Sequence, residues 1–465
     1  MGFVLSILYF VVSYLTPAAL FGPFAQYRIE LVLAGLIFLV SVPKFMGSYV
    51  FKTPQVLALA GLAVAVFCSV LFGVHWAGGA VQSFMAFLPS IYAYFMVCLH
   101  FNSKARLKAL ILVLLFVCLF DLVHATIELR QISTEGAPSM VEEDRDSSRS
   151  LWDLNHPYVL PMRSDTGEWF YRIRGLGFIN DPNDFGQLLV TSMPLLIFFW
   201  DLEKRIRNLA LVLLPVCLLL VAVFLTHSRG ALLALVAVVL VASRRRIGTV
   251  PAGILAGLLL IAAMALQFTG GRAISADTGA DRTALWGGGL EVLKSYPLFG
   301  VGLGQLPDYL GQTAHNSIMV CAAELGLVGL YFWSLFILSS VRNAMVIASP
   351  EQISEVRLPT TGESPPLFPI WKGEHLSRID VNRMGLSLLL SLTGFLVSAW
   401  FLSRAFVMTF FLLGGIVQVV YEEAHREGMH DSKIPLPRLL VYTLVLSGSL
   451  LIAVYYLVRI LNQMH

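Results

Sequence analysis

The chain has 465 residues, of which 57% are hydrophobic and 13% charged, and its mean hydropathy is +0.76. This apolar content exceeds what a soluble core can hide, so the composition excludes a soluble enzyme and predicts an all-α polytopic membrane protein. The net charge of +3 is small and the basic residues stand in short loops, so we expect membrane lipids as partners and exclude nucleic acid.

Apolar runs that are long enough to cross a bilayer follow one another along the whole chain. A spanning helix needs about 20 apolar residues, and by that measure we expect about 12–13 spans. They lie near residues 3–20, 29–43, 55–73, 80–99, 107–127, 185–200, 208–226, 230–243, 250–268, 314–340, 385–401, 405–421 and 437–458. The first lacks the basic start of a signal peptide, so we expect a retained helix. The five cysteines lie within these runs without the spacing of metal ligands and are expected in the core.

The orientation of the spans follows from three clusters of basic residues in short loops. These are Lys104, Arg106 and Lys108, then Lys204, Arg205 and Arg207, and then Arg244, Arg245 and Arg246. Because such loops stay in the cytoplasm, alternation places the N-terminus inside and the long loops 128–184 and 269–313 outside. The proline-containing loop 341–384 is expected in the cytoplasm, and residues 1–465 are expected to form a single transmembrane domain.

The segment RIRGLGFINDPND stands at the end of the first external loop. Its DPN triplet is typical of a turn and a helix N-cap, which favours a capping role for Asp181, Asn183 and Asp184. Capping does not account for Arg172 and Arg174, two arginines that alternate with apolar residues. These two arginines are therefore candidates for binding an anion.

The segment THSRGALL separates two apolar spans by only a few residues. A tight external turn accounts for Ser228 and Gly230. Arg229 would lie at the edge of the bilayer, where a guanidinium is costly unless it snorkels to water or meets an anion. Both explanations of Arg229 stay open.

The second external loop predicts an amphipathic helix from Asp281 to Lys294, with a break at Pro297. In the simplest interpretation this helix lies on the membrane surface and Trp286 anchors it at the interface. The GVGLG sequence that follows resembles a phosphate-binding glycine loop. No strand precedes it and no GK[ST] follows it, so we reject that function.

The segment AHNSIMVCAAELGLVG places His315 and Asn316 at the external mouth of an apolar run and Glu324 within it. A single histidine at a membrane boundary is commonly a structural hydrogen-bonding residue. In one regular helix, 100° per residue would turn Glu324 to the face opposite His315, so the two would not pair. Glu324 must be paired, protonated or facing a wet cavity.

In this order, RIRGLGFINDPNDF, THSRGALLAL, DRTALWGGGLEVLKSYPLFGVGLGQL and AHNSIMVCAAELGLVGLYFW resemble the O-antigen ligase and polymerase superfamily of bacterial envelope enzymes. The resemblance runs from about Arg172 to Trp333. It implies a GT-C-like glycosyltransferase of the bacterial inner membrane that needs neither a metal nor a cofactor. The donor would be a glycan on undecaprenyl diphosphate, and the external loops would face the periplasm. The acceptor would be a hydroxyl of a lipid A-core sugar, of another lipid-linked glycan or of a protein.

The resemblance also implies roles for the polar residues. Four arginines would bind the diphosphate and supply the charge that a divalent ion supplies in other glycosyltransferases: Arg172, Arg174, Arg229 and Arg282. His315 would act with Arg282 in catalysis, either accepting the proton of the acceptor hydroxyl in an inverting displacement or binding the diphosphate. The residues with supporting roles would be Asn316, Asp281, Asn183, Asp184 and Glu324.

The main alternative is a transporter or flippase for lipid-linked or anionic substrates, because transporters also have about a dozen spans and intramembrane charges. Transporters usually show repeat symmetry and helices broken at mid-membrane. This chain shows no internal repeat, and its arginines and histidine gather on one expected face. The sequence separates neither a ligase from a polymerase nor one sugar from another.

Overall fold

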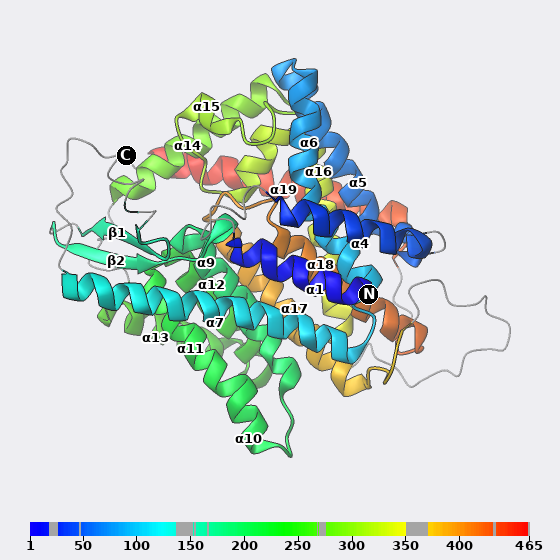
Figure 1. The fold of residues 1–465 in the computed structure, drawn as a ribbon. Coiled ribbons are helices and arrows are strands. Elements are labelled where there is room, and N and C mark those ends of the chain that lie inside the picture. The colour runs from blue at the N-terminus through cyan, green and yellow to red at the C-terminus, as the bar shows by residue number, and fades with distance from the viewer. Residues whose placement is uncertain are drawn as a thin grey trace. The chain divides into compact units, whose positions relative to one another are not determined.

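The computed structural model describes residues 1–17, 27–45, 48–135, 152, 155–164, 167–266, 268, 276–349, 371–430 and 434–463. Within these residues the regular structure is helical apart from one two-stranded sheet (Figure 1). Seven of the described helices are long and apolar enough to cross a membrane: Pro54–Val74, Ala77–His100, Lys104–Ser133, Arg205–Thr226, Ser317–Ile347, Arg378–Ala399 and Leu436–Leu461. The prediction of an all-α polytopic membrane protein is confirmed, and the larger number of spans stays a prediction.

The chain divides into two compact units, each built from segments that are distant in the sequence. The first unit contains Met1–Val42, Ala105–Ala273 and Thr393–Ser398, and the second contains Pro43–Lys104, Ile274–Leu392 and Ala399–His465.

The first unit combines helices with the hairpin. In chain order its elements are α1 (Gly2–Leu15), most of α4 (Ile29–Phe45), α7 (Lys104–Glu135), β1 (Val159–Arg163), β2 (Trp169–Ile173), α9 (Pro182–Ser192), α10 (Arg205–Asn208), α11 (Leu214–Thr226), α12 (Arg229–Ile247) and α13 (Thr249–Ala265). The two strands are antiparallel, with Val159 opposite Ile173 (Figure 1). Trp152 packs against Val159 and against Ile132 of α7, so the hairpin is attached to the end of α7.

Helix α9 packs against both α11 and α12. The approach is close because Gly186 has no side chain, and a Cβ atom there would lie 2.8 Å from the Cβ of Ala231. This packing brings the start of α9 to the turn between α11 and α12, where two of the predicted polar motifs stand.

The second unit is a helical bundle with α16 at its centre. Its elements are α5 (Pro54–Ser69), α6 (Ala77–His100), α14 (Ala276–Ser295), α15 (Leu306–Leu310), α16 (Ser317–Ile347), most of α17 (Arg378–Ala399), α18 (Met408–Arg426) and α19 (Leu436–Gln463). Helix α16 packs on α5 and α18, and α18 packs on α6. The side chains of Phe336, Phe410 and Phe411 are fully buried and contact one another at edge-to-face or tilted angles, as aromatic pairs prefer.

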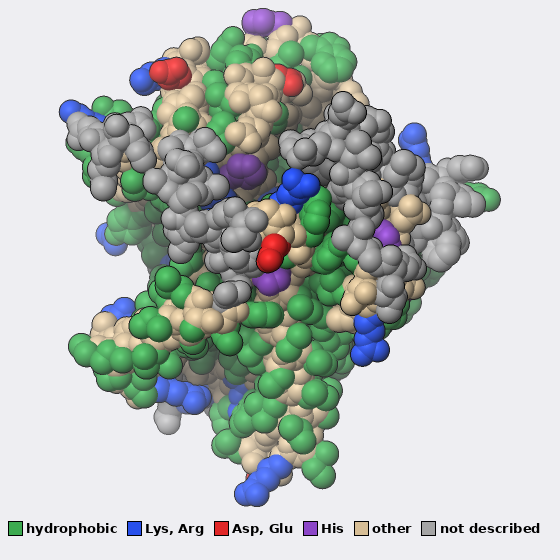
Figure 2. Space-filling model, turned by 90° about the vertical axis from the view of Figure 1, so that its left-hand side faces the viewer, with side chains coloured by type: hydrophobic (Ala, Val, Ile, Leu, Met, Phe, Trp, Pro, Cys, Tyr) green, Lys and Arg blue, Asp and Glu red, His purple; other side chains and the backbone are tan. Residues whose placement is uncertain are grey.

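The surfaces of the helices support a lipid environment. In α16, 78% of the apolar window is buried, whereas in α19 only 17% is, so α19 exposes most of its apolar side chains. Hydrophobic side chains also predominate over charged ones on the face drawn in Figure 2. An exposed apolar helix of this length is stable in lipid and costly in water.

Helices enter the predicted loops from both ends. α7 continues to Glu135, inside the predicted loop 128–184, and α9 begins at Pro182. α16 continues to Ile347 and α17 begins at Arg378, both inside the predicted loop 341–384. The proline-rich centre of that loop, 350–370, lies outside the described residues. The sides of the membrane on which the loops lie stay predictions.

Candidate functional site

In the first unit, Arg172 joins three segments that the sequence singled out. Its Nε donates to the carbonyl of Thr226 (2.7 Å) and its Nη2 donates to Oδ1 of Asn183 (2.9 Å). The hydroxyl of Ser228 donates to the same Asn183 oxygen (2.9 Å). The RIRG, DPND and THSRG motifs therefore meet, and these hydrogen bonds hold them together. Arg172, at the centre of the network, is only 4% exposed.

Arg174 is also held by its own chain. Its Nε donates to the carbonyl of Pro157 (2.9 Å), and its two terminal nitrogens donate to the carbonyls of Asn180 and His156 (3.4 Å each). A guanidinium offers five N–H groups, and Arg172 and Arg174 each use several of them within their own chain. In this structure they organise the hairpin and the start of α9.

The capping prediction is confirmed for Asp181, which is the N-cap of α9 and accepts from the N–H of Asn183 (2.7 Å). Asn183 uses its side chain for the Arg172 network, and Asp184 is buried in the first turn of the helix. Arg229 is the first residue of α12, and its neighbour Ser228 is the N-cap. Arg229 is half-buried at this end of the helix.

Sequence reasoning missed a polar face on α7. Asp121, His124 and Glu128 follow one another at helical spacing, and Asp121 is fully buried with neither carboxyl oxygen hydrogen-bonded among the described residues. Glu128 accepts from the N–H of Tyr158 (3.0 Å), whose ring stacks on His124. Burial, followed by the charges of Asp121 and Glu128, raises the pKa of Tyr158. A Cβ at Gly175 would lie 2.8 Å from Asp121, so this face lies directly under the RIRG motif.

In the second unit, His315 lies in a turn that two serines hold in place. Its φ is +48°, in the left-handed region, and its N–H donates to Oγ of Ser403 (2.9 Å). Ser317 Oγ donates to the carbonyl of Leu402 (2.6 Å), so both ends of the turn are tied to the segment before α18. A left-handed histidine costs free energy that the surrounding bonds offset, and such strained positions cluster at functional sites.

Asn316 is the N-cap of α16. Its Oδ1 accepts from the N–H groups of Ile318 (2.9 Å) and Met319 (3.1 Å). Its Nδ2 is buried and has no hydrogen-bond partner among the described residues. A buried amide without a partner is costly, so this nitrogen is available to a ligand beside His315.

His315 and Glu324 do not lie in one regular helix, so the premise from which we predicted opposite faces for them is wrong. His315 precedes the N-cap Asn316 and has a left-handed backbone, whereas Glu324 lies within α16. Their relative direction therefore does not follow from 100° per residue.

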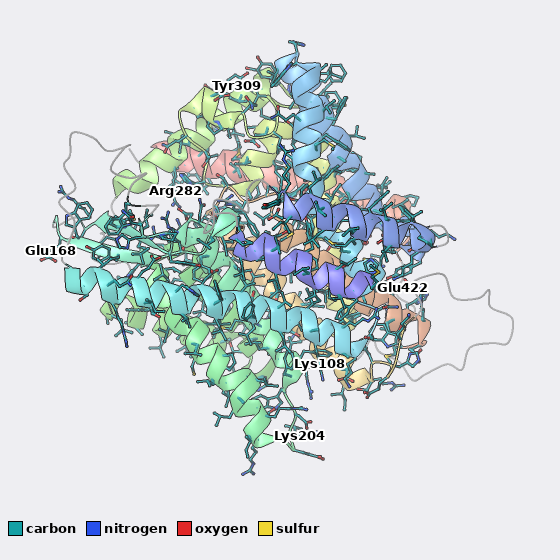
Figure 3. The ribbon with its side chains drawn as sticks, in the orientation of Figure 1. Lys108, Glu168, Lys204, Arg282, Tyr309 and Glu422 are labelled. Atoms are coloured by element: carbon teal, nitrogen blue, oxygen red, sulfur yellow. The ribbon has the colours of Figure 1, made fainter. Side chains whose placement is uncertain are left out.

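The helix predicted from Asp281 to Lys294 is present as α14, and it leads to the His315 turn. Trp286 is 5% exposed and its Nε1 donates to the carbonyl of Ala314 (2.8 Å), so it is an internal anchor rather than one at the membrane interface. Arg282 stands one helical turn before Trp286, on the same face of α14, and is half-buried (Figure 3). The side chain of Asp281 lies outside the described residues.

Helix α16 is interrupted at Gly326, where φ is +66° and ψ is −168°, and this break is filled by the loop that follows α14. The N–H of Leu327 donates to the carbonyl of Pro297 (2.8 Å), and the N–H of Val301 donates to the carbonyl of Ala323 (3.0 Å). A broken helix is the feature expected of a transporter. Here the loop after α14, and not a substrate, forms hydrogen bonds with the backbone groups that lose their helical partners at Gly326.

Glu324 is bound by the glycine-rich sequence that we rejected as a phosphate loop. Its carboxyl group accepts hydrogen bonds from the N–H groups of Gly304 and Leu306, and its carbonyl accepts from the N–H of Gly302 (3.0 Å). Glu324 is 5% exposed. Of the three possibilities for this glutamate, the structure shows pairing, and the pairing stabilises the bundle.

Replacing Gly326 with Ala is expected to destabilise the second unit. A Cβ there would lie 2.3 Å from the backbone of Leu298, and the left-handed φ adds strain of about 1–3 kcal/mol. Thermal unfolding of the detergent-solubilised protein measures the loss. Gly253→Ala in α13 is the matched control, because nothing lies within 4 Å of its added Cβ. Equal melting temperatures for the two variants would show that the loop and the break are not packed as described.

The predicted site residues thus lie in two sets, one in each unit. The first set is Arg172, Arg174, Asn183, Asp184 and Arg229. The second set is Arg282, His315, Asn316 and Glu324.

Comparison with known proteins supports the resemblance seen in the sequence. The family model of O-antigen ligase matches residues 214–334, from the start of α11 into α16. This range contains Arg229, Arg282, His315 and Glu324, and the arginines of the hairpin precede it. No curated protein matches the chain. Residues 214–334 of the chain are therefore similar to the O-antigen ligase family.

Proposed function

We propose that the protein transfers a glycan from undecaprenyl diphosphate to an acceptor hydroxyl at the periplasmic face of the bacterial inner membrane. The family match gives the general class, which is glycosyl transfer from a lipid-linked donor by a multi-pass membrane protein. One observation carries the proposal furthest. Trp286, one turn after Arg282, is hydrogen-bonded to the residue before His315, so a cation and a proton acceptor are held at the same end of the second unit.

The leaving diphosphate is the group that needs most stabilisation. When the bond between the anomeric carbon and the diphosphate oxygen breaks, negative charge develops on that oxygen, and guanidinium groups bind phosphate oxygens in pairs. We assign this role to Arg282 in the second unit, and the resemblance implies phosphate binding also by Arg172, Arg174 and Arg229 in the first unit. Fixed arginines supply the charge without a metal ion.

The acceptor hydroxyl needs a base and a partner that orients it. Its oxygen attacks the anomeric carbon, its proton passes to the His315 imidazole, and the single displacement inverts that carbon. The buried Nδ2 of Asn316 is a donor for a sugar oxygen next to that imidazole. The alternative role of His315, as a ligand of the diphosphate, predicts a different kinetic effect. Supporting roles are assigned to Asp281, Asn183, Asp184 and Glu324.

The sidedness rests on the basic loops. Lys108 near the start of α7 and Lys204 before α10 mark two of the loops assigned to the cytoplasm (Figure 3). The donor glycan would then meet the enzyme after it has been flipped to the periplasm. The acceptor is a lipid A-core sugar, a second lipid-linked glycan or a protein hydroxyl.

A strain that lacks the gene tests the function and separates its branches. Mass spectrometry of the envelope glycans is expected to show loss of attachment for a ligase, or single repeat units for a polymerase. In both cases the lipid-linked donor accumulates. Loss of the glycans together with a donor confined to the cytoplasmic leaflet would instead identify a flippase.

Removal of metal is expected to leave transfer intact. Purified protein in lipid nanodiscs, supplied with donor extracted from the deletion strain, should release undecaprenyl diphosphate at the same initial rate with and without EDTA. Fixed guanidiniums are not removed by a chelator, which is the physical reason for this expectation. A rate that falls with EDTA and returns with Mg²⁺ or Mn²⁺ would contradict it.

A further inference from the structure

Three side chains with metal-ligand chemistry meet at the C-terminal end of α18. Glu423 and Glu427 are one helical turn apart, and His375 comes from the segment before α17. His375 Nδ1 lies 2.7 Å from Oε1 of Glu423 and 3.0 Å from Oε1 of Glu427. The ligand atoms of all three lie within 4.8 Å of one another. We name these three residues the α18 cluster.

The two carboxylates are in an unfavourable place unless a cation joins them. Like charges at i and i+4 of a helix repel, and the C-terminal end of a helix also disfavours negative charge. Burial adds a cost, because Glu423 is only 3% exposed. The nearby cation on the same helix, Arg426, is bonded to Glu422 and lies over the ring of Tyr49.

The imidazole alone satisfies the two carboxylates poorly. One nitrogen, Nδ1, faces an oxygen of each, and it carries at most one hydrogen for the two acceptors. A metal ion accepts the lone pair of Nδ1 and one oxygen from each carboxylate at the same time. The three ligand atoms are therefore arranged as in a metal site, with the hydrogen on Nδ1 in the place of the ion.

The segment that supplies His375 is held in place on both sides. The N–H of Lys372 donates to the carbonyl of Asn102 (2.8 Å), and Trp371 Nε1 donates to the carbonyl of Glu374 (3.0 Å). Ser377 N–H and Oγ both donate to the carboxylate of Asp380 at the start of α17 (3.2 and 2.8 Å). A ligand fixed in this way loses little entropy when an ion binds.

We propose that His375, Glu423 and Glu427 bind a divalent transition-metal ion of the Zn²⁺ type, with water at the remaining positions. One imidazole with two carboxylates suits such ions, whereas Mg²⁺ and Ca²⁺ prefer oxygen ligands alone. The His375 side chain is 58% exposed, which leaves room for water. The ion would join the segment before α17 to the end of α18.

This site is separate from the proposed chemistry. α18 has 19 residues and is therefore about 28 Å long. Its first residue, Met408, follows the segment that holds the His315 turn, and the cluster lies at its other end. The ion is thus assigned to architecture, and its presence does not conflict with transfer that tolerates EDTA.

Zinc content and thermal stability of the full-length protein test the proposal. Wild type, incubated with ZnCl₂ and then desalted, is expected to keep about one zinc per chain by mass spectrometry and to melt at a higher temperature than the chelator-treated protein. Glu427→Gln and His375→Ala are expected to weaken zinc binding at least tenfold. Glu374→Gln is the matched control, since this exposed neighbour of His375 is not part of the cluster.

Several outcomes would overturn the site. They are wild type without stoichiometric zinc, ligand variants that keep it, or a control that loses it together with them. Because His375 stands on an exposed segment, His375→Ala decides the question if Glu427→Gln does not fold. Glycan transfer by Glu427→Gln is expected to stay at the wild-type rate, so loss of zinc and failure of the proposed function give different results.

Discussion

Arg282→Ala is expected to lower kcat for glycan transfer by about 10²–10³-fold while the protein stays folded in the membrane. The physical reason is the charge that develops on the leaving diphosphate, which a half-buried guanidinium stabilises far more than water does. Arg282→Lys keeps the charge and loses the paired hydrogen bonds, so we expect an intermediate rate. The rate at which undecaprenyl diphosphate is released in nanodiscs is measured for the wild type, Arg282→Ala and Arg282→Lys.

The same helix offers the control for this experiment. Lys294 is an exposed cation near the end of α14, and Lys294→Ala is expected to transfer at the wild-type rate. A general effect of charge on donor binding would lower both rates. Wild-type turnover in Arg282→Ala, with its melting temperature unchanged, would remove Arg282 from the proposed diphosphate site.

Local signals in the sequence predicted the elements well. Apolar runs located the long helices, and a break at Pro297 correctly ended the helix that begins before Arg282. Asp181 was recognised as an N-cap because capping depends on residues within one turn. These features need no knowledge of distant contacts.

Contacts between distant segments were not predictable. Glu324 accepts hydrogen bonds from Gly304 and Leu306. These residues reach it because the loop after α14 packs into the break of α16. The break itself had a weak signal, since a glycine in a membrane helix is common. The partners of Arg172 likewise come from the turn after α11.

Asp121 is a different kind of omission, because its signal was present. An aspartate within the apolar run 107–127 is costly in a membrane and marks a functional position by default. We predicted this run only as a span, and the structure shows that Asp121 lies on a polar face of α7 under the RIRG motif.

His315→Asn is expected to lower kcat by about 10²–10⁴-fold, which is the usual contribution of a positioned general base. Asparagine is the appropriate replacement because it tolerates the left-handed backbone of this position, whereas alanine would add strain to the loss of the imidazole. The hydrogen bond from the backbone to Ser403 stays available in this variant. Initial rates at several donor and acceptor concentrations separate kcat from KM.

The kinetic pattern distinguishes the two roles that His315 can have. Loss of a base lowers kcat and removes the acidic limb of the pH profile, whereas loss of a diphosphate ligand that binds donor and transition state alike raises the KM for donor. His75→Asn is the matched control, because His75 also has a left-handed backbone (φ +58°) and is exposed in the same unit. If His315→Asn turns over within a few fold of His75→Asn, the histidine holds the N-terminal turn of α16 and takes no part in proton transfer.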